Sequence, residues 1–166
     1  ERINIELSLR NKLALCDALT QFFQGDLPVK VGDSKLDKAE LIGELRDQAL
    51  EHIASVRARW QWLLDNLDLP LAEAETRFAE FGIVAGELTN KAAQPTLFHR
   101  LQDYSVRASW KKELKEPLDI IFDGPVFRPL SEKMEAVQKE VLRGRVFVAL
   151  HMHAGDGNVH TNIPVN

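Results

Sequence analysis

The sequence predicts an α+β fold, in which a helical N-terminal region is followed by one more helix and an antiparallel β-hairpin. Apolar residues recur at steps of three and four through most of the chain, which is the spacing of amphipathic helices. Near the C-terminus the step shortens to two, which is the alternation of a β-strand. The chain has 166 residues, 45% of them hydrophobic, so it is long enough to form a core.

Two long amphipathic helices are expected first. The first ends at Gly25, and the second begins after Ser34, which forms a capping-box-like start with Asp37. The second helix should run for roughly 30 residues, long enough to form an antiparallel helical hairpin with the first, with Trp60 in the core. The apolar positions are Ile5, Leu9, Leu13, Cys16, Leu19 and Phe23 in the first helix, and Ile42, Leu45, Ala49, Ile53, Val56, Trp60, Leu63 and Leu67 in the second.

Shorter helical segments should follow. Pro70 opens one that Gly82 and Gly86 weaken, so a kink or an early end is expected there. Pro95 suits the first turn of a helix that uses Leu97, Leu101, Tyr104 and Ala108 and that Pro117 should interrupt. Residues 122–129, rich in glycine and proline, read as a loop.

The C-terminal segment should be helix, strand, turn and strand. Leu130, Met134, Val137 and Val141 form a short helical stripe, and Gly144 is its expected C-terminal stop. Residues 146–152 then alternate as a strand. Residues 155–158 have the sequence Gly-Asp-Gly-Asn of a tight turn, and residues 159–165 alternate as the return strand.

Composition excludes several classes of protein. The net charge is -4 and no basic stripe is present, so nucleic acid is not an expected partner. The longest strongly apolar run, residues 146–150, is far shorter than the roughly 20 residues that a membrane span requires. The single cysteine, Cys16, cannot form an internal disulfide and should be a buried, inert thiol. No targeting segment is recognisable, so a cytoplasmic location is expected.

Histidines on the expected hairpin form a candidate metal site. If His153 and His160 lie opposite one another on the two strands, their imidazoles could hold one divalent ion, with Asn162 beside it for a substrate oxygen. Two histidines are fewer than the three protein ligands usual for a catalytic zinc, and a hairpin with surface or core histidines stays open as an alternative. His52 and His99, each alone on a predicted helix, are expected to be structural.

Residues 153–162, HAGDGNVHTN, resemble a known signature. The pattern His-x-Gly-Asp-Gly-Asn-[Leu/Val]-His-x-Asn is typical of the C-terminal domain of FAD-linked oxidases, which include D-lactate dehydrogenases, the flavin subunit of glycolate oxidase and D-2-hydroxyglutarate dehydrogenases. The resemblance extends over residues 129–166. It implies that the helix and hairpin belong to a ferredoxin-like substrate domain.

The resemblance also implies roles for individual residues. His153 and His160 would bind a divalent metal, and the expected metal is zinc. Asn162 would contact the substrate, a small 2-hydroxy acid. FAD would be held by a domain absent from this chain, and the catalytic residues, with a third metal ligand, would lie downstream of Asn166. Some larger relatives also carry an iron-sulfur module elsewhere. The chain would thus be part of a flavoprotein oxidoreductase that oxidises a 2-hydroxy acid, and alone it would be inactive.

Two departures from the family pattern accompany this resemblance. The family has an aromatic residue and a glycine just before the signature, where this chain has His151 and Met152. Residues 1–82 match nothing in the family. We therefore expect residues 1–94 to form a helical insertion or accessory arm, and residues 95–166 to be a truncated C-terminal substrate domain. The chain begins with Glu1 rather than Met and stops directly after an expected strand, which is typical of a fragment.

Two other functions stay open as alternatives. A metal-dependent hydrolase could use the pair His151 and His153 at a strand end, although such folds need further ligands. A helical interaction module would rest on the long stripe of the second helix. A hairpin with an unpaired edge would also allow pairing between chains, so a homodimer is possible.

Overall fold

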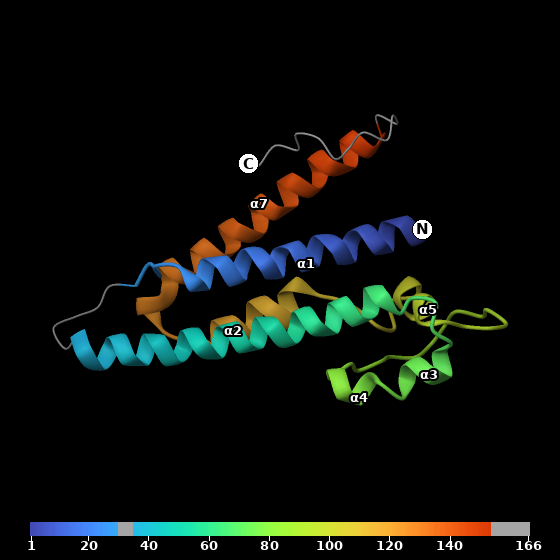
Figure 1. Ribbon diagram of the computed structural model, residues 1–166, viewed down its shortest axis with the longest axis horizontal. Coiled ribbons are helices and arrows are strands. Elements are labelled where there is room, and N and C mark those ends of the chain that lie inside the picture. The colour runs from blue at the N-terminus through green and yellow to red at the C-terminus, as the bar shows by residue number, and fades with distance from the viewer. Residues whose placement is uncertain (30–34, 154–166) are drawn as a thin grey trace.

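The computed structural model describes residues 1–29 and 35–153, and within these ranges it is all-helical (Figure 1). Helices and helical turns are joined by loops, and a lone antiparallel bridge links Pro70 to Thr96. No β-strand occurs in this part of the chain. The predicted α+β fold with an antiparallel hairpin is therefore wrong for the described residues.

Helices α1 (Arg2–Gln24) and α2 (Lys35–Asp65) run antiparallel along the length of the molecule, as predicted (Figure 1). Their facing stripes supply most of the core, and Trp60 is fully buried in it. The stripe residues that are buried are Leu9, Leu13, Cys16, Leu19 and Phe23 from α1, and Ala49, Ile53, Val56, Trp60, Leu63 and Leu67 from α2.

Helix α7 (Arg128–His153) packs against α1 on the side away from α2, so α1 lies between two long helices (Figure 1). This arrangement explains the burial of Leu15, which is 4% exposed although it lies outside the predicted stripe. Leu130 and Met134 on α7 are fully buried, as their helical spacing predicted.

The chain between α2 and α7 forms short helical segments. These are α3 (Leu71–Glu75), α4 (Phe78–Phe81) and α5 (Leu97–Gln102), then the π-helical turn η1 (Lys111–Lys115), α6 (Glu116–Ile121) and the 3₁₀ turn η2 (Pro125–Phe127). The early end predicted near Gly82 is confirmed, because Gly82 adopts a left-handed conformation with φ 68°. Glycine takes this conformation without the clash that a Cβ atom would cause.

Two helix predictions in this region need correction. The helix that starts at Leu97 ends at Gln102 instead of reaching Ala108, because Tyr104 has a positive φ of 63°, which a right-handed helix cannot contain. Pro117 does not interrupt a helix but lies in the first turn of α6, where its missing N–H costs nothing.

The C-terminal prediction is wrong from Gly144 onward. Gly144 does not end a helix, since α7 continues through it to His153 and includes residues 146–152, the predicted first strand. The backbone N–H and C=O groups of a strand need hydrogen-bond partners on a neighbouring strand. No strand lies in the described ranges to provide these partners. A helix satisfies the same groups within the segment itself. The predicted turn and return strand, residues 155–165, lie outside the described residues.

Aromatic side chains close the core where α1 meets the short helices. Phe122 stacks on Phe23 with ring centroids 5.4 Å apart and meets Phe127 edge-on, also at 5.4 Å. These contacts attach the segment that precedes α7 to the C-terminal half of α1. Within the described ranges, no helix combines the length and the apolar character that crossing a bilayer requires.

Gly144 provides a test of the continuous α7. A Cβ atom added there would meet nothing within 4 Å, and the backbone lacks the positive φ of a C-terminal glycine stop. The substitution Gly144→Ala should therefore raise the free energy of unfolding by about 0.5–1 kcal/mol, the difference in helix propensity. Urea unfolding followed by circular dichroism measures the change.

The matched control is Gly82→Ala, at a glycine whose φ is positive. That substitution should destabilise the protein, because alanine is strained in the left-handed conformation. A loss of stability in Gly144→Ala similar to that in Gly82→Ala would mean that Gly144 ends the helix after all.

Candidate functional site

The residues predicted to bind metal and substrate are only partly within the described structure. His153 is the last residue of α7, and His151 lies in the same helix. His160 and Asn162 lie outside the described residues. The prediction that His153 lies on a β-strand is wrong, because it lies in α7. Among the described residues, no group of three or more histidine, cysteine or acidic side chains is placed to hold a metal ion.

The other histidines and the cysteine have structural surroundings. Nε2 of His52 donates to the carbonyl oxygen of Glu113 at 2.6 Å, which ties α2 to η1. Nδ1 of His99 accepts from the backbone N–H of Thr96 at 2.9 Å as part of the capping box of α5. Cys16 is fully buried, and this burial raises the pKa of its thiol to about 12. A thiol with so high a pKa is a poor nucleophile near neutral pH.

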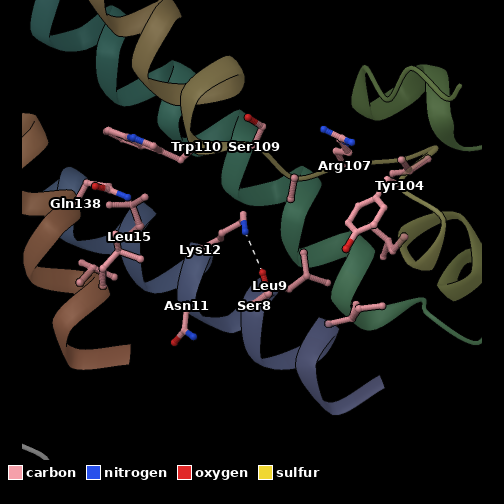
Figure 2. A pocket seen from close by; sticks show the side chains of 16 residues that line it. Ser8, Leu9, Asn11, Lys12, Leu15, Tyr104, Arg107, Ser109, Trp110 and Gln138 are labelled. Carbon is pink, nitrogen blue, oxygen red and sulfur yellow. Dashed lines mark hydrogen bonds between the residues drawn. The ribbon is translucent and has the colours of Figure 1, made fainter. Parts of the chain in front are cut away.

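The described residues line a pocket of about 500 Å³ (Figure 2). It lies between the N-terminal half of α1, the loop that follows α5 and the middle of α7. Its volume is in the range of small-molecule sites, about 300–1,000 Å³. The apolar lining residues are Ile5, Leu9, Leu15, Leu101, Val106, Ala108, Val141 and Leu142.

The charged side chains among the described lining residues are both cationic. Lys12 projects from α1 into the middle of the view and donates to the hydroxyl of Ser8 at 2.9 Å, and Arg107 lies at the rim (Figure 2). No acidic residue is among these lining residues, although the chain as a whole has a net charge of -4.

Tyr104 forms the rim beside Arg107 and carries backbone strain. It is the one non-glycine residue with positive φ in the described ranges, at 63°. Such a conformation costs roughly 1–2 kcal/mol for a residue with a bulky side chain. The guanidinium carbon of Arg107 lies 5.3 Å from the centre of the Tyr104 ring, a cation–π contact. The strained turn thus places an arginine and a tyrosine together at the mouth of the pocket.

Asn11 contributes an unpaired donor to the lining. Its Nδ2 atom is inaccessible to solvent and has no hydrogen-bond acceptor among the described residues. A buried donor without a partner costs about 1–3 kcal/mol, so such atoms are few in folded proteins. Asn11 and Gln138 lie toward α7, away from the end where Tyr104 and Arg107 lie (Figure 2).

Comparison with known proteins finds no match: no family model fits the chain, and neither a curated protein nor a solved structure is significantly similar to it.

A polar network behind the pocket holds its Ser109–Trp110 wall. Glu113 accepts from Arg59 at 2.5 Å through Oε1, and from the indole N–H of Trp60 at 3.2 Å through Oε2. The same Oε2 accepts from the backbone N–H of Ser109 at 2.6 Å. Because the side chains of Arg59 and Glu113 are only 20% and 16% exposed, this ion pair is partly protected from solvent screening. The wall is therefore fixed to α2.

A second network fixes the turn that carries Tyr104. Arg100 is buried and donates to the carbonyl oxygen of Gly86 at 2.7 Å and to Glu75 at 2.8 Å. Asp103 accepts from the backbone N–H groups of Thr89, Asn90 and Ser105 at 2.7, 3.0 and 2.9 Å. These bonds attach the long loop after α4 to the end of α5 and so support the pocket rim.

Sequence reasoning did not find this pocket. Lys12 and Arg107 are 95 positions apart and belong to no motif, and the helical stripe assigned Tyr104 to the interior of a helix. A signal was present in Asp103, since aspartate often caps a turn by accepting from backbone N–H groups two residues on. Asp103 would have predicted the end of α5 at the correct residue. It would not have predicted that α7 packs against the side of α1 that lines the pocket.

The Glu113 network predicts a specific loss of stability. Glu113→Gln should lower the free energy of unfolding by roughly 1.5–3 kcal/mol, because it removes the charge that pairs with Arg59 and leaves one acceptor oxygen for several donors. Urea unfolding measures the loss. The control is Glu132→Gln on the exposed face of α7, which should change stability little. Equal stability of the two variants would show that the network contributes nothing.

Asp103 predicts a pH dependence of the loop. Desolvation raises the pKa of its carboxyl, but the hydrogen bonds from Ser105, Asn90 and Thr89 outweigh this effect and hold the pKa below its ordinary value. Because the pKa is lowered in the folded state, the carboxylate stabilises the loop at pH values above about 3.9, the pKa of an aspartate in the unfolded chain. This stabilisation is lost progressively as the pH falls from there toward the lower pKa of the folded state. At pH values below about 4, the amide-exchange protection of Thr89 and Asn90 should therefore decrease.

The variant Asp103→Asn tests the same contacts at neutral pH. It should reduce the exchange protection of those two amides roughly tenfold or more, because a charged acceptor is lost. Asp123→Asn, at an exposed site beyond α6, is the control and should leave them unchanged. Unchanged protection in Asp103→Asn would contradict the role given to this carboxylate.

Proposed function

We propose that this chain is part of an FAD-linked oxidoreductase that oxidises a 2-hydroxy acid, to which it contributes metal and substrate ligands. The single observation that carries the proposal is the run at residues 153–162, which agrees with the oxidase signature at all seven of its fixed positions. This agreement is found in the sequence alone and does not depend on the predicted hairpin. The first strand of that hairpin, residues 146–152, is helical in the structure.

The donor types of the run suit a divalent cation. His153 and His160 provide two imidazoles, which are common zinc ligands, and a further ligand would have to come from elsewhere in the protein. A metal in such a site supplies Lewis acidity that makes a hydroxyl group easier to deprotonate. The carboxamide of Asn162 can donate to a substrate carboxylate or accept from its hydroxyl, and so orient it. FAD would be bound by another domain, and any iron-sulfur cluster would also lie outside this chain.

The described helices support the proposal through the position of α7. This helix packs on α1 through its N-terminal half and ends at His153, the first residue of the signature. The attachment of α7 to the core therefore determines where the signature begins. In this proposal, the described helices that precede Gly144 act as a support for the segment that carries the ligands.

A helical interaction module is the second candidate. It is favoured by the all-helical character of the described residues and by exposed apolar side chains, among them Ile3, Val84 and Tyr104, which are 67%, 90% and 69% exposed. Hydrogen bonds from Gln102 to Glu1 and from Gly86 to Ser105 bring the elements that carry them to one end of the molecule. The hydrolase alternative needed His151 and His153 at the end of a strand, and both lie in α7.

The proposal is tested on the full-length protein that contains this chain. The variants His153→Ala and His160→Ala should lose the bound metal and slow flavin reduction by D-2-hydroxy acids at least ~100-fold, since loss of even an outer-shell partner of a metal costs about 10–100-fold. Metal content is measured by mass spectrometry, and flavin reduction by the loss of its visible absorbance. Asn162→Ala should raise KM while the metal is retained.

The matched control is His151→Ala, which removes a neighbouring imidazole that the signature does not include. It should keep both the metal and the rate of flavin reduction. Unchanged metal content and rate in His153→Ala and His160→Ala would refute the proposal. A full-length protein that contains no flavin would refute it too, and would favour the interaction module.

A further inference from the structure

We infer that the pocket binds, at its end next to α7, a planar nitrogen heterocycle with neighbouring hydrogen-bond donor and acceptor atoms, such as a purine or pyrimidine base. Trp110 stacks on the ring, and Gln138 binds its edge. Lys12, which donates to the hydroxyl of Ser8, takes no part in this binding. The pocket shares no described lining residue with the signature at residues 153–162, so the inference does not depend on the function proposed above.

Two polar side chains with unused hydrogen-bonding groups lie at this end of the pocket. Figure 2 shows Trp110 and Gln138 there, one from the wall before η1 and the other from α7. Neither the indole N–H of Trp110 nor the carboxamide of Gln138 makes a hydrogen bond to another described residue. Both side chains are half-buried, and in contrast to Nδ2 of Asn11 their polar atoms remain accessible to solvent. A ligand in the pocket can therefore reach them.

The carboxamide of Gln138 selects a ligand edge that both donates and accepts. A carboxamide has an acceptor oxygen and an NH₂ donor side by side. It can therefore form two hydrogen bonds with a heterocycle that presents a donor next to an acceptor, as glutamine and asparagine do with adenine. A ligand carboxylate only accepts, so it would leave the carboxamide oxygen of Gln138 without a partner.

The neighbouring walls suit a flat ring. The indole of Trp110 provides an aromatic face, and Leu15 from α1 and Val141 and Leu142 from α7 line the same end of the pocket. Bases of every kind stack on aromatic side chains, because each base has a π face. The volume of about 500 Å³ is large enough for a ligand of this size. A saturated molecule would contact the aliphatic walls equally well but would gain no stacking.

The wall that carries Trp110 is fixed without a ligand. Oε2 of Glu113 accepts from the backbone N–H of Ser109, the residue before Trp110, and Oε1 accepts from Arg59 on α2. The hydroxyl of Ser109 accepts from the backbone N–H of Lys112 in the following turn. A site that is ordered in advance loses less conformational entropy on binding. Stacking on Trp110 therefore does not require this wall to be ordered first.

Adenosine is the probe, and the 166-residue chain is the protein used. Binding is measured by calorimetry and by the indole N–H signals of the tryptophans in ¹H–¹⁵N spectra. Trp110 lines the pocket, whereas Trp60 and Trp62 are buried in the core, so adenosine should shift the signal of Trp110 alone. Dimethyladenosine, whose amino group carries two methyl groups and no hydrogen, should bind at least roughly tenfold more weakly.

Gln138→Leu should weaken adenosine binding about tenfold, because it removes the hydrogen bonds to the edge of the ring. Leucine is as good a helix former as glutamine, so this variant should fold normally. The matched control is Gln48→Leu, at an exposed glutamine on α2 outside the pocket, which should not change binding. Trp110→Leu should also weaken binding about tenfold, because stacking is lost.

Uridine, tested in the same way, distinguishes a one-ring base from a two-ring base. Tighter binding of uridine than of adenosine would support the inference and would assign the pocket to a pyrimidine. Four outcomes would overturn the inference. They are no binding of either nucleoside, equal binding of adenosine and dimethyladenosine, an equal effect of the Gln48 and Gln138 substitutions, and a shift confined to the two core tryptophans.

Discussion

The burial of α1 on two sides is the constraint on which the structure depends. A helix with a single apolar stripe can pack against one neighbour, but α1 meets both α2 and α7 (Figure 1). Leu13, Leu19 and Phe23 belong to the predicted stripe, and Leu15 adds burial outside it. Two contact surfaces fix a helix more firmly than one, and they also determine where its polar residues lie. Lys12 and Asn11 line the pocket as a result.

How much of this could be predicted from the sequence depends on the range of the interactions involved. The hairpin of α1 and α2 was predicted well because its stripes are long and their periodicity is a property of each segment alone. Cys16 and Trp60 are buried as expected for the same reason. The end of α5 was missed because it depends on Asp103 and on a loop some 13 residues earlier, which periodicity does not register.

The C-terminal error has a different origin. Alternation at residues 146–152 is a necessary feature of a half-buried strand, but it states nothing about a partner strand. Without a partner among the described residues, the segment continues the helix in which Met134 and Val137 already lie. The candidate ligands were predicted by residue type and spacing in the signature, and their types are unaffected by this error. Their geometry was predicted from pairing across two strands, which does not apply to His153 because it lies in α7.

The π-helical turn η1 makes the register of this region sensitive to chain length. A π-turn of this kind is commonly equivalent to one residue inserted into an α-helix. Because the π-turn absorbs the extra residue, the helix beyond it keeps the face that α6 presents to α2. A second residue inserted into this turn would not be absorbed in this way and would rotate α6 by about 100° relative to α2. Leu118, which is fully buried, would then turn away from the core.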